Sequence, residues 1–176
     1  MKAYFVRHGQ TNYNVKKLCN DDPTKDVHLT KLGKQQAKTV ADKLKNIKLD
    51  LVYVSELPRT RETADIITKD QPMDFIVEPR ISDRKTGFDS QPESKFFDSI
   101  KPDPFNIKLN DGESFQEEKK RVFSFLEELK GLNAKSILVV SHSEILKIVY
   151  GYFHNLSDEE MWEKHIDNAQ VLEFDI

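Results

Sequence analysis

Three short stretches of this 176-residue chain carry side chains that suit phosphate chemistry. The first contains Arg7 and His8, the second ends at Arg59, and the third contains His142 followed by Ser143. Arginine offers a planar fork of donors that matches phosphate oxygens, and a neutral histidine can accept a phosphoryl group as a nucleophile. Together these residue types indicate a phosphate-binding pocket that contains an imidazole nucleophile.

Each of these stretches follows an apolar run that is typical of a buried strand. The three runs are 3–6, 51–54 and 136–140, and weaker strands are expected at 75–77 and 171–174. Apolar residues at helical spacing predict helices over 30–44, 58–69 and 114–129 and a fourth from residue 143 onward. This alternation of strands and helices predicts an α/β fold with a mainly parallel central sheet.

Parallel strands place their carboxyl ends at one edge of the sheet, which is where α/β proteins bind ligands. We therefore expect Arg7, His8, Arg59 and His142 to converge there. The helix expected after His142 would add free backbone N–H groups and a dipole that favours an anion. Ser143 in its first turn and Asn14 after the first strand complete the set of substrate-binding candidates.

Other interpretations of the same residues are a surface ion pair for each arginine and a metal site for the two histidines. A metal site would need further ligands at short spacing, and Arg7 and Arg59 would repel a cation. We therefore expect no metal ion and no cofactor. The remaining histidines have no such neighbours and are interpreted as structural; they are His28, His154 and His165.

Composition limits the class of protein. Hydrophobic residues make up 38% and charged residues 32%, as in a single soluble domain over 1–176. The lone Cys19 excludes an internal disulfide, and a net charge of −3 gives no reason to expect nucleic acid. No apolar run suits a membrane helix, and Arg7 comes too early for a secretory leader, so a cytoplasmic protein is expected. The oligomeric state is not indicated.

The stretch from about 83 to 111 departs from the alternating pattern. Gly87, Pro92, Pro102 and Pro104 interrupt it and disfavour a long helix or a central strand. Four aromatic residues are scattered through it; they are Phe88, Phe96, Phe97 and Phe105. Two interpretations stay open, a lid or binding loop over the pocket and a satellite core beneath a surface loop.

An ordered series of motifs resembles the histidine phosphatase superfamily, in its phosphoglycerate mutase-like branch. The series comprises R-H-G-Q-T from Arg7 with Asn14, L-T-x-x-G-x-x-Q-A from Leu29, S-x-L-x-R from Ser55, G-E-S from Gly112, V-S-H from Val140 and N-A from Asn168. The resemblance covers nearly the whole chain, and an ordered series is far more specific than one triplet. It implies a three-layer α/β/α sandwich.

The resemblance also implies roles for individual residues in a metal-free reaction. His8 would attack phosphorus, and Arg7, Arg59 and His142 would hold the phosphoryl oxygens with Asn14 nearby. A general acid must protonate the leaving oxygen, and the family usually places a glutamate two residues after an apolar position and four before a glycine. Here Asp83 stands in that place.

The expected function is that of a metal-independent phosphatase acting on a small phosphorylated metabolite. Gln10 in place of the mutases' glutamate, and the short chain, favour a phosphatase over a mutase. Glu144 and the pair Asp21–Asp22 would add negative charge near the pocket, which disfavours a bisphosphate. The alternatives are a phosphohistidine-protein phosphatase, a phosphoglycerate mutase and a catalytically idle binding protein of the same fold.

Overall fold

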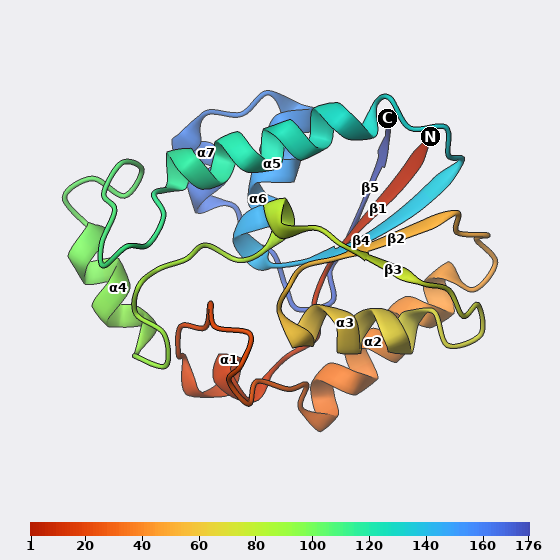
Figure 1. The fold of residues 1–176 in the computed structure, drawn as a ribbon, viewed down its shortest axis with the longest axis horizontal. Helices are drawn as coiled ribbons and strands as arrows, with labels where there is room; N and C mark the ends of the chain where they lie inside the picture. Colours follow the sequence, from red (N-terminus) through yellow and green to blue (C-terminus); the bar gives the residue numbers. More distant parts are fainter.

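The centre of the protein is a five-stranded sheet with the strand order β3-β2-β4-β1-β5 (Figure 1). In the computed structural model, which describes residues 1–176, these strands are β1 (Lys2–Arg7), β2 (Leu51–Val54), β3 (Phe75–Val77), β4 (Ser136–Ser141) and β5 (Val171–Asp175). Neighbouring strands among β1 to β4 run parallel, and β5 pairs antiparallel with β1. The predicted mainly parallel sheet is confirmed.

Helices cover both faces of the sheet (Figure 1). One face carries α2 (Lys31–Leu44) and α3 (Pro58–Ile67); the other carries α5 (Phe115–Leu129), α6 (Ser143–His154) and α7 (Asp158–Glu163). The shorter elements are α1 (Asn12–Lys16), α4 (Glu93–Ile100) and a 3₁₀ turn (Pro79–Ile81). The three-layer α/β/α architecture is therefore confirmed. No helix is both long and apolar enough to cross a membrane.

The central strands read as continuous apolar runs because both of their faces are buried. In β1, Ala3 and Phe5 belong to the core shared with α5 and α6, whereas Tyr4 and Val6 belong to the core shared with α2 and α3. β4 alternates in the same way and is buried at every position. These central strands have no solvent face, and their pairing register sets the level at which each strand ends.

Local signals in the sequence explain where α2 begins. Thr30 caps the helix and its hydroxyl accepts a hydrogen bond from the Gly33 N–H at 3.0 Å, as the sequence predicted. Gly33 is needed because a Cβ there would lie 2.1 Å from the Gln10 carbonyl oxygen. A Cβ on Gly9 would likewise lie 2.4 Å from the Gly33 carbonyl oxygen. The two glycines thus let the loop after β1 pack directly against α2.

Some element details differ from the sequence prediction. α3 ends at Ile67 instead of reaching Lys69, and Ile66 is only half-buried. Leu32 follows the helical spacing of the apolar residues in α2 but is 52% exposed, because it lies in the first turn, beyond the edge of the core. The short helices α1 and α7 were not predicted, since five or six residues carry too little periodicity to be recognised.

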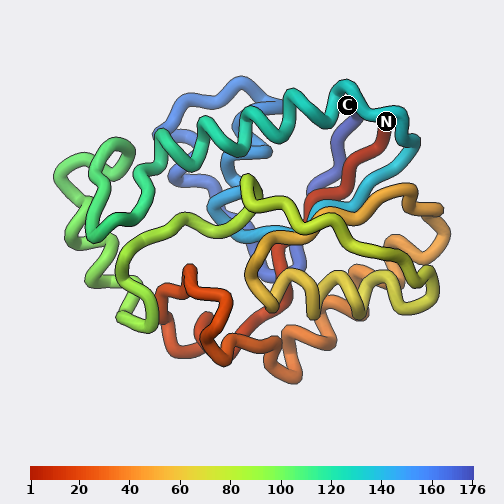
Figure 2. Tube along the Cα trace, viewed as in Figure 1, coloured from red at the N-terminus to blue at the C-terminus, as the bar shows by residue number.

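The stretch from about 83 to 111 forms an excursion beside the sheet, drawn in green in Figure 2. It contains the short helix α4, whose buried Phe96 and Ile100 pack with Cys19. Phe88, Ile107 and Trp162 surround this cluster. The satellite core that the sequence allowed is therefore present, and the same segment also contributes residues to the cavity described next.

Candidate active site

The register of the sheet brings three strand ends to one level. Arg7 of β1 pairs with Ser141 of β4, and Val54 of β2 pairs with Val140 of β4. The residues that follow these strand ends are therefore neighbours; they are His8, Ser55 and His142. The backbone N–H of His8 donates to the Ser141 carbonyl at 2.9 Å, which continues the ladder of the sheet by one residue.

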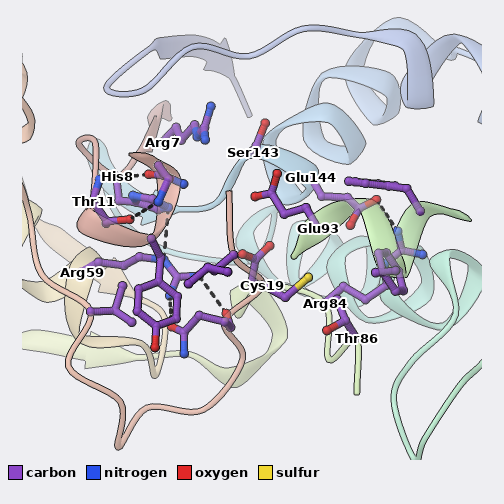
Figure 3. A pocket seen from close by; sticks show the side chains of 18 of the residues that line it. Arg7, His8, Thr11, Cys19, Arg59, Arg84, Thr86, Glu93, Ser143 and Glu144 are labelled. Atoms are coloured by element: carbon purple, nitrogen blue, oxygen red, sulfur yellow. Dashed lines mark hydrogen bonds and ion pairs between the residues drawn. The ribbon is translucent and has the colours of Figure 1, made fainter. Parts of the chain in front are cut away.

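A cavity of about 410 Å³ opens at this edge of the sheet (Figure 3). A volume of this size suits a small-molecule ligand. Six of the seven predicted site residues line it, namely Arg7, His8, Asn14, Arg59, Asp83 and Ser143. His142 lies directly behind them and is fully buried, with its ring centroid 5.3 Å from that of His8. The structure thus brings all seven residues together.

The imidazole of His8 is held in one orientation. Its Nδ1 lies 2.8 Å from the Gly9 carbonyl oxygen, which can only accept, so Nδ1 carries the proton. The other ring nitrogen, Nε2, therefore has a free lone pair, and the Arg59 Nε–H donates to it at 3.1 Å. Burial, and then the charge of Arg59, lowers the pKa of His8 well below its ordinary value. His8 thus presents a neutral nucleophilic nitrogen.

Two arginines surround that nitrogen. Arg59 is the second residue of α3, after Pro58 at the first helical position, and is only 4% exposed. Its guanidinium donates to the Asn20 side-chain oxygen at 2.6 Å and to Asp83 Oδ2 at 2.9 Å. Arg7 donates to the Ile166 carbonyl oxygen at 2.7 Å, and its buried Nε has no hydrogen-bond partner. Both arginines line the cavity that contains this nitrogen, where their guanidinium groups can meet an anion.

His142 supplies a second imidazole with an unused nitrogen. Its Nε2 is hydrogen-bonded to the Ser55 hydroxyl at 2.8 Å. Its Nδ1 is buried without a hydrogen-bond partner and lies 3.6 Å from Asp83 Oδ2. Burial, and then the charge of Arg59, lowers the pKa of His142 well below its ordinary value. A phosphoryl oxygen in the cavity would satisfy this orphaned nitrogen.

The two remaining predicted residues, Asn14 and Ser143, differ in which of their polar groups are free to bind a ligand. The Asn14 side-chain oxygen accepts from the Thr11 backbone N–H at 3.0 Å and so caps α1, which leaves its NH₂ group available to the cavity. The Ser143 hydroxyl makes only a long 3.5 Å contact to the Ile166 carbonyl oxygen. Ser143 also begins α6, so its backbone N–H lies at the positive end of the helix dipole.

Arg84 is only 2% exposed, whereas most arginines in proteins are solvated. It donates to Glu144 Oε1 at 2.7 Å, and its guanidinium carbon lies 5.0 Å from the Phe96 ring centroid and 5.4 Å from that of Trp162. Glu144 is therefore paired and does not add an unbalanced negative charge to the cavity. That part of the expected argument against a bisphosphate is wrong.

The structure also bears on three other sequence-based inferences about the site, which concern Gln10, Asp21 and a metal ion. Gln10 lies outside the cavity, and its side-chain oxygen accepts from the Thr30 hydroxyl, so it does not contact a ligand there. Asp21 accepts from the Thr86 backbone N–H at 2.7 Å and is likewise not a cavity-lining residue. No group of three or more His, Cys, Asp or Glu side chains is arranged to hold a metal ion.

Among the cavity-lining residues that sequence reasoning missed are three with polar or aromatic side chains, Glu93, Lys147 and Trp162. Glu93 precedes Phe96 and Phe97 by three and four positions, which is the spacing of one helical face. Lys147 follows Ser143 by four positions in the predicted fourth helix. Both spacings were available as signals, but only the placement of α4 and α6 shows that these faces meet the cavity.

The lowered pKa values of His8 and His142 lead to a pH prediction. Both imidazoles should stay neutral as the pH falls from about 7.5 to about 5.5, whereas the unfolded chain takes up protons near 6.5. The unfolded state then binds more protons, so the free energy of unfolding should fall over this range by up to about 1.4 kcal/mol per pH unit for each histidine. Imidazole ¹⁵N shifts and urea unfolding in phosphate-free buffer measure the two effects.

Assignment through the variants His8→Ala and His142→Ala identifies the two buried rings in the NMR titration. The exposed histidines in the same spectrum serve as references; they are His28 and His165. Protonation of His8 close to pH 6.5 would contradict the neutral nucleophile that the geometry indicates.

Comparison with known proteins gives one family. Residues 3–176 match the family described as the histidine phosphatase superfamily (branch 1). A Hydrogenobacter thermophilus protein named "Putative phosphoserine phosphatase 2" is 30% identical over 183 residues, which cover 98% of this chain and 88% of that protein. The adenosylcobalamin/alpha-ribazole phosphatase of Escherichia coli K12 is 27% identical, with 96% and 87% covered.

A comparison of structures, and a further comparison of sequences, gives proteins of similar kinds. The crystal structure of the alpha-ribazole phosphatase from Shigella flexneri superimposes with a TM-score of 0.89 at 25% identity, covering 100% of this chain and 91% of that one. A 2,3-bisphosphoglycerate-dependent phosphoglycerate mutase from Thermoplasma acidophilum is 26% identical, with 99% of this chain and 86% of that protein covered. Both phosphatases and mutases are therefore among the relatives.

Proposed function

Because the chain belongs to the histidine phosphatase superfamily, we propose that it hydrolyses a small phosphomonoester through a phosphohistidine intermediate, without a metal ion. The observation that carries this proposal is the His8 Nε2 lone pair, held beside two arginines in a cavity of about 410 Å³. The relatives include phosphatases named for phosphoserine and alpha-ribazole, and both names refer to small molecules.

In the first half-reaction, His8 Nε2 attacks phosphorus and a P–N bond forms while the ester P–O bond breaks. Arg7 and Arg59 neutralise the charge that develops on the phosphoryl oxygens, and the orphaned His142 Nδ1 serves one of them. In this step Arg59 exchanges its contact with Nε2 for contacts with the substrate. Asp83 donates a proton to the leaving oxygen, so that the product departs as an alcohol.

In the second half-reaction, water attacks the phosphorus of phosphohistidine. Asp83, now a carboxylate, takes a proton from that water as the new P–O bond forms and the P–N bond breaks. His8 is released neutral and inorganic phosphate leaves, so the enzyme returns to its starting protonation state. The contact of Asp83 with Arg59 at 2.9 Å supports the position of this group, because it keeps the carboxyl beside the guanidinium that binds the phosphoryl oxygens. The carboxyl acts as the acid in its protonated form, once Arg59 has exchanged this contact for the substrate.

The residues around the cavity favour a metabolite over a protein substrate. Its walls come from α1, α4, α6 and the end of α7 as well as from the strand ends. A phosphohistidine on a partner protein would have to reach His8 past α4 and Trp162, which line the cavity. We propose that the segment from about 83 to 111 acts as a lid-like wall that excludes bulk water from the site.

Hydrolysis of para-nitrophenyl phosphate by the purified protein tests this function, and the rate should be unchanged by EDTA. Arg59→Lys keeps a charge but loses the fork that contacts His8, Asn20 and Asp83. We expect kcat/KM to fall roughly tenfold to a hundredfold, or about 1.4–2.8 kcal/mol of transition-state binding. The exposed Arg61→Lys is the matched control on α3. Full activity of Arg59→Lys, or inhibition by EDTA, would contradict the mechanism.

A further inference from the structure

Ser55 is a buried residue that contacts the site without lining the cavity. It directly follows Val54, the last residue of β2, and begins the S-x-L-x-R motif that ends at Arg59. Its hydroxyl oxygen lies 2.8 Å from His142 Nε2, and the Leu57 backbone N–H donates to that oxygen at 3.2 Å. The backbone thus holds the Ser55 hydroxyl in place against the second imidazole of the site.

His142 has two ring nitrogens with different neighbours and one proton to share between them. Burial, and then the charge of Arg59, lowers the pKa of His142 well below its ordinary value, so the ring is neutral at neutral pH. A neutral imidazole has one N–H and one bare nitrogen. Nε2 meets the Ser55 hydroxyl, and Nδ1 meets the carboxylate of Asp83, which lines the cavity. The position of the proton therefore decides whether Nδ1 can donate to a phosphoryl oxygen.

Two arrangements of protons fit the distances around Ser55. In the first, the Ser55 hydroxyl donates to His142 Nε2, and the ring proton is on Nδ1. In the second, Nε2–H donates to Ser55, which must then donate to Thr60 Oγ1 at 3.0 Å, while Thr60 donates to the Leu57 carbonyl oxygen at 2.9 Å. The second arrangement leaves Nδ1 bare.

The Asp83 carboxylate distinguishes the two arrangements. Its Oδ2 accepts from Arg59 at 2.9 Å and lies 3.6 Å from His142 Nδ1. A bare Nδ1 would place one lone pair against another, which is costly for a buried polar atom. A protonated Nδ1 directs its N–H toward a negative charge, and this attraction acts beyond hydrogen-bond distance. The geometry therefore favours the first arrangement, in which Ser55 is the donor.

We propose that Ser55 is a positioning residue for His142: its hydroxyl donates to Nε2, which fixes the orientation of the ring and keeps the ring proton on Nδ1, facing the phosphoryl site. This inference rests on the proposed function, which places a phosphoryl oxygen beside Nδ1. His142 is then a donor without a positive charge, unlike Arg7 and Arg59. It needs neither to gain nor to lose a proton in either half-reaction.

The position of the proton can be measured in the unchanged protein. Protonated and bare imidazole nitrogens have well-separated ¹⁵N shifts, and loss of the signals in His142→Ala assigns the ring. In phosphate-free buffer we expect a protonated Nδ1 and a bare Nε2. Addition of inorganic phosphate should shift the Nδ1 signal and leave the proton on the same nitrogen. A proton on Nε2, with or without phosphate, would overturn the proposal.

Two substitutions test which hydroxyl is responsible. Ser55→Ala removes the donor, so the Nε2 signal of His142 should move toward that of a nitrogen without a hydrogen bond. Thr60→Val is the matched control, because Thr60 accepts the Ser55 proton only in the second arrangement. We expect this variant to leave the proton on Nδ1. An unchanged Nε2 signal in Ser55→Ala, or a proton moved to Nε2 in Thr60→Val, would contradict the assigned donor.

Kinetics show whether Ser55 acts through His142. Ser55→Ala should lower kcat/KM for para-nitrophenyl phosphate roughly tenfold, because the Nδ1 donor is no longer held toward the transferring group. The same substitution should cost little in the His142→Ala background, since residues that act as one unit are not additive. Equal costs in both backgrounds would mean that Ser55 supports the fold alone, and circular dichroism checks that each variant is folded.

The NMR measurement needs no turnover and so separates this inference from the proposed function. A protonated Nδ1 held by Ser55, in a protein that does not hydrolyse para-nitrophenyl phosphate, would mean that the proposed function has failed while the contact stands. Hydrolysis by a protein whose His142 carries its proton on Nε2, or in which Ser55→Ala changes neither spectrum nor rate, would mean that only this inference has failed.

Discussion

Replacing His8 with alanine is expected to abolish turnover while leaving the fold intact. The substitution removes Nε2, the only atom placed to form the P–N bond, and loss of a nucleophile costs about 10⁴-fold or more in kcat. The fold should survive because the imidazole is neutral in the folded protein, so its removal leaves no buried charge without a partner. The rate of para-nitrophenyl phosphate hydrolysis measures the loss of turnover, and circular dichroism shows whether the fold is intact.

Trapping the intermediate identifies the bond that forms. A phosphoenzyme quenched during turnover should be stable in alkali and labile in acid, as a phosphoramidate is, and mass spectrometry should locate the phosphate on His8. His28→Ala is the matched control, because His28 is exposed and should leave both rate and intermediate unchanged. An acid-stable phosphoserine or phosphothreonine, or activity retained by His8→Ala, would refute the mechanism.

The edge of the sheet that carries the site could be predicted from the sequence because the central strands are buried on both faces. Such strands appear as unbroken apolar runs, so the first chemically active residue after each run marks a strand end. β2 and β3 have the predicted bounds, and β4 ends at Ser141, one residue beyond the prediction. The convergence of His8 and His142 then follows from parallel pairing, which a single sequence predicts through strand–helix alternation.

The environment of Arg84 could not be predicted in this way. Arginine is almost always exposed unless it is paired, and its partners here are distant in sequence. Glu118 and Glu144 come from two other helices, and burial raises the pKa of Glu118. A pattern of neighbours along the chain carries no information about such contacts, so the more frequent solvated position was the rational expectation.

Gly9 shows a different limit of prediction from the sequence. Its lack of a side chain could serve close approach of the backbone to phosphate, but the structure shows that the missing Cβ makes room for the Gly33 carbonyl. Both interpretations require glycine at the same position. Only the tertiary contact between the loop after β1 and α2 distinguishes them.

Replacing Asp83 with asparagine is expected to separate two kinds of substrate. An alkyl phosphate releases a poor leaving group that needs a proton, so its rate should fall by roughly 10²–10⁴, the usual contribution of a general acid. Para-nitrophenolate departs without a proton, so phosphoenzyme formation from para-nitrophenyl phosphate should fall far less. Rapid-quench measurement of phosphoenzyme formation with both substrates gives the comparison.

Asp89 and Glu113 are two other carboxyls near this segment, and their contacts argue against either as the acid. Asp89 accepts from the Asn20 side chain and from the Asp21 backbone N–H, and Glu113 pairs with Arg121 at 2.7 Å. Neither lines the cavity, whereas Glu93 does. Asp89→Asn is therefore the matched control for Asp83→Asn, and Glu93→Gln tests the one other carboxyl that lines the cavity without an ion pair.

The ion pair between Asp83 and Arg59 decides how the outcomes are interpreted. Asparagine would weaken that 2.9 Å contact, so part of any loss comes from a displaced guanidinium and should affect both substrates alike. The additional loss of rate that is seen only with the alkyl phosphate measures the proton-donating role of Asp83. An equal loss for both substrates would make Asp83 a positioning residue for Arg59. No loss for either, together with a selective loss in Glu93→Gln, would place the acid on α4 and require a different path for the proton.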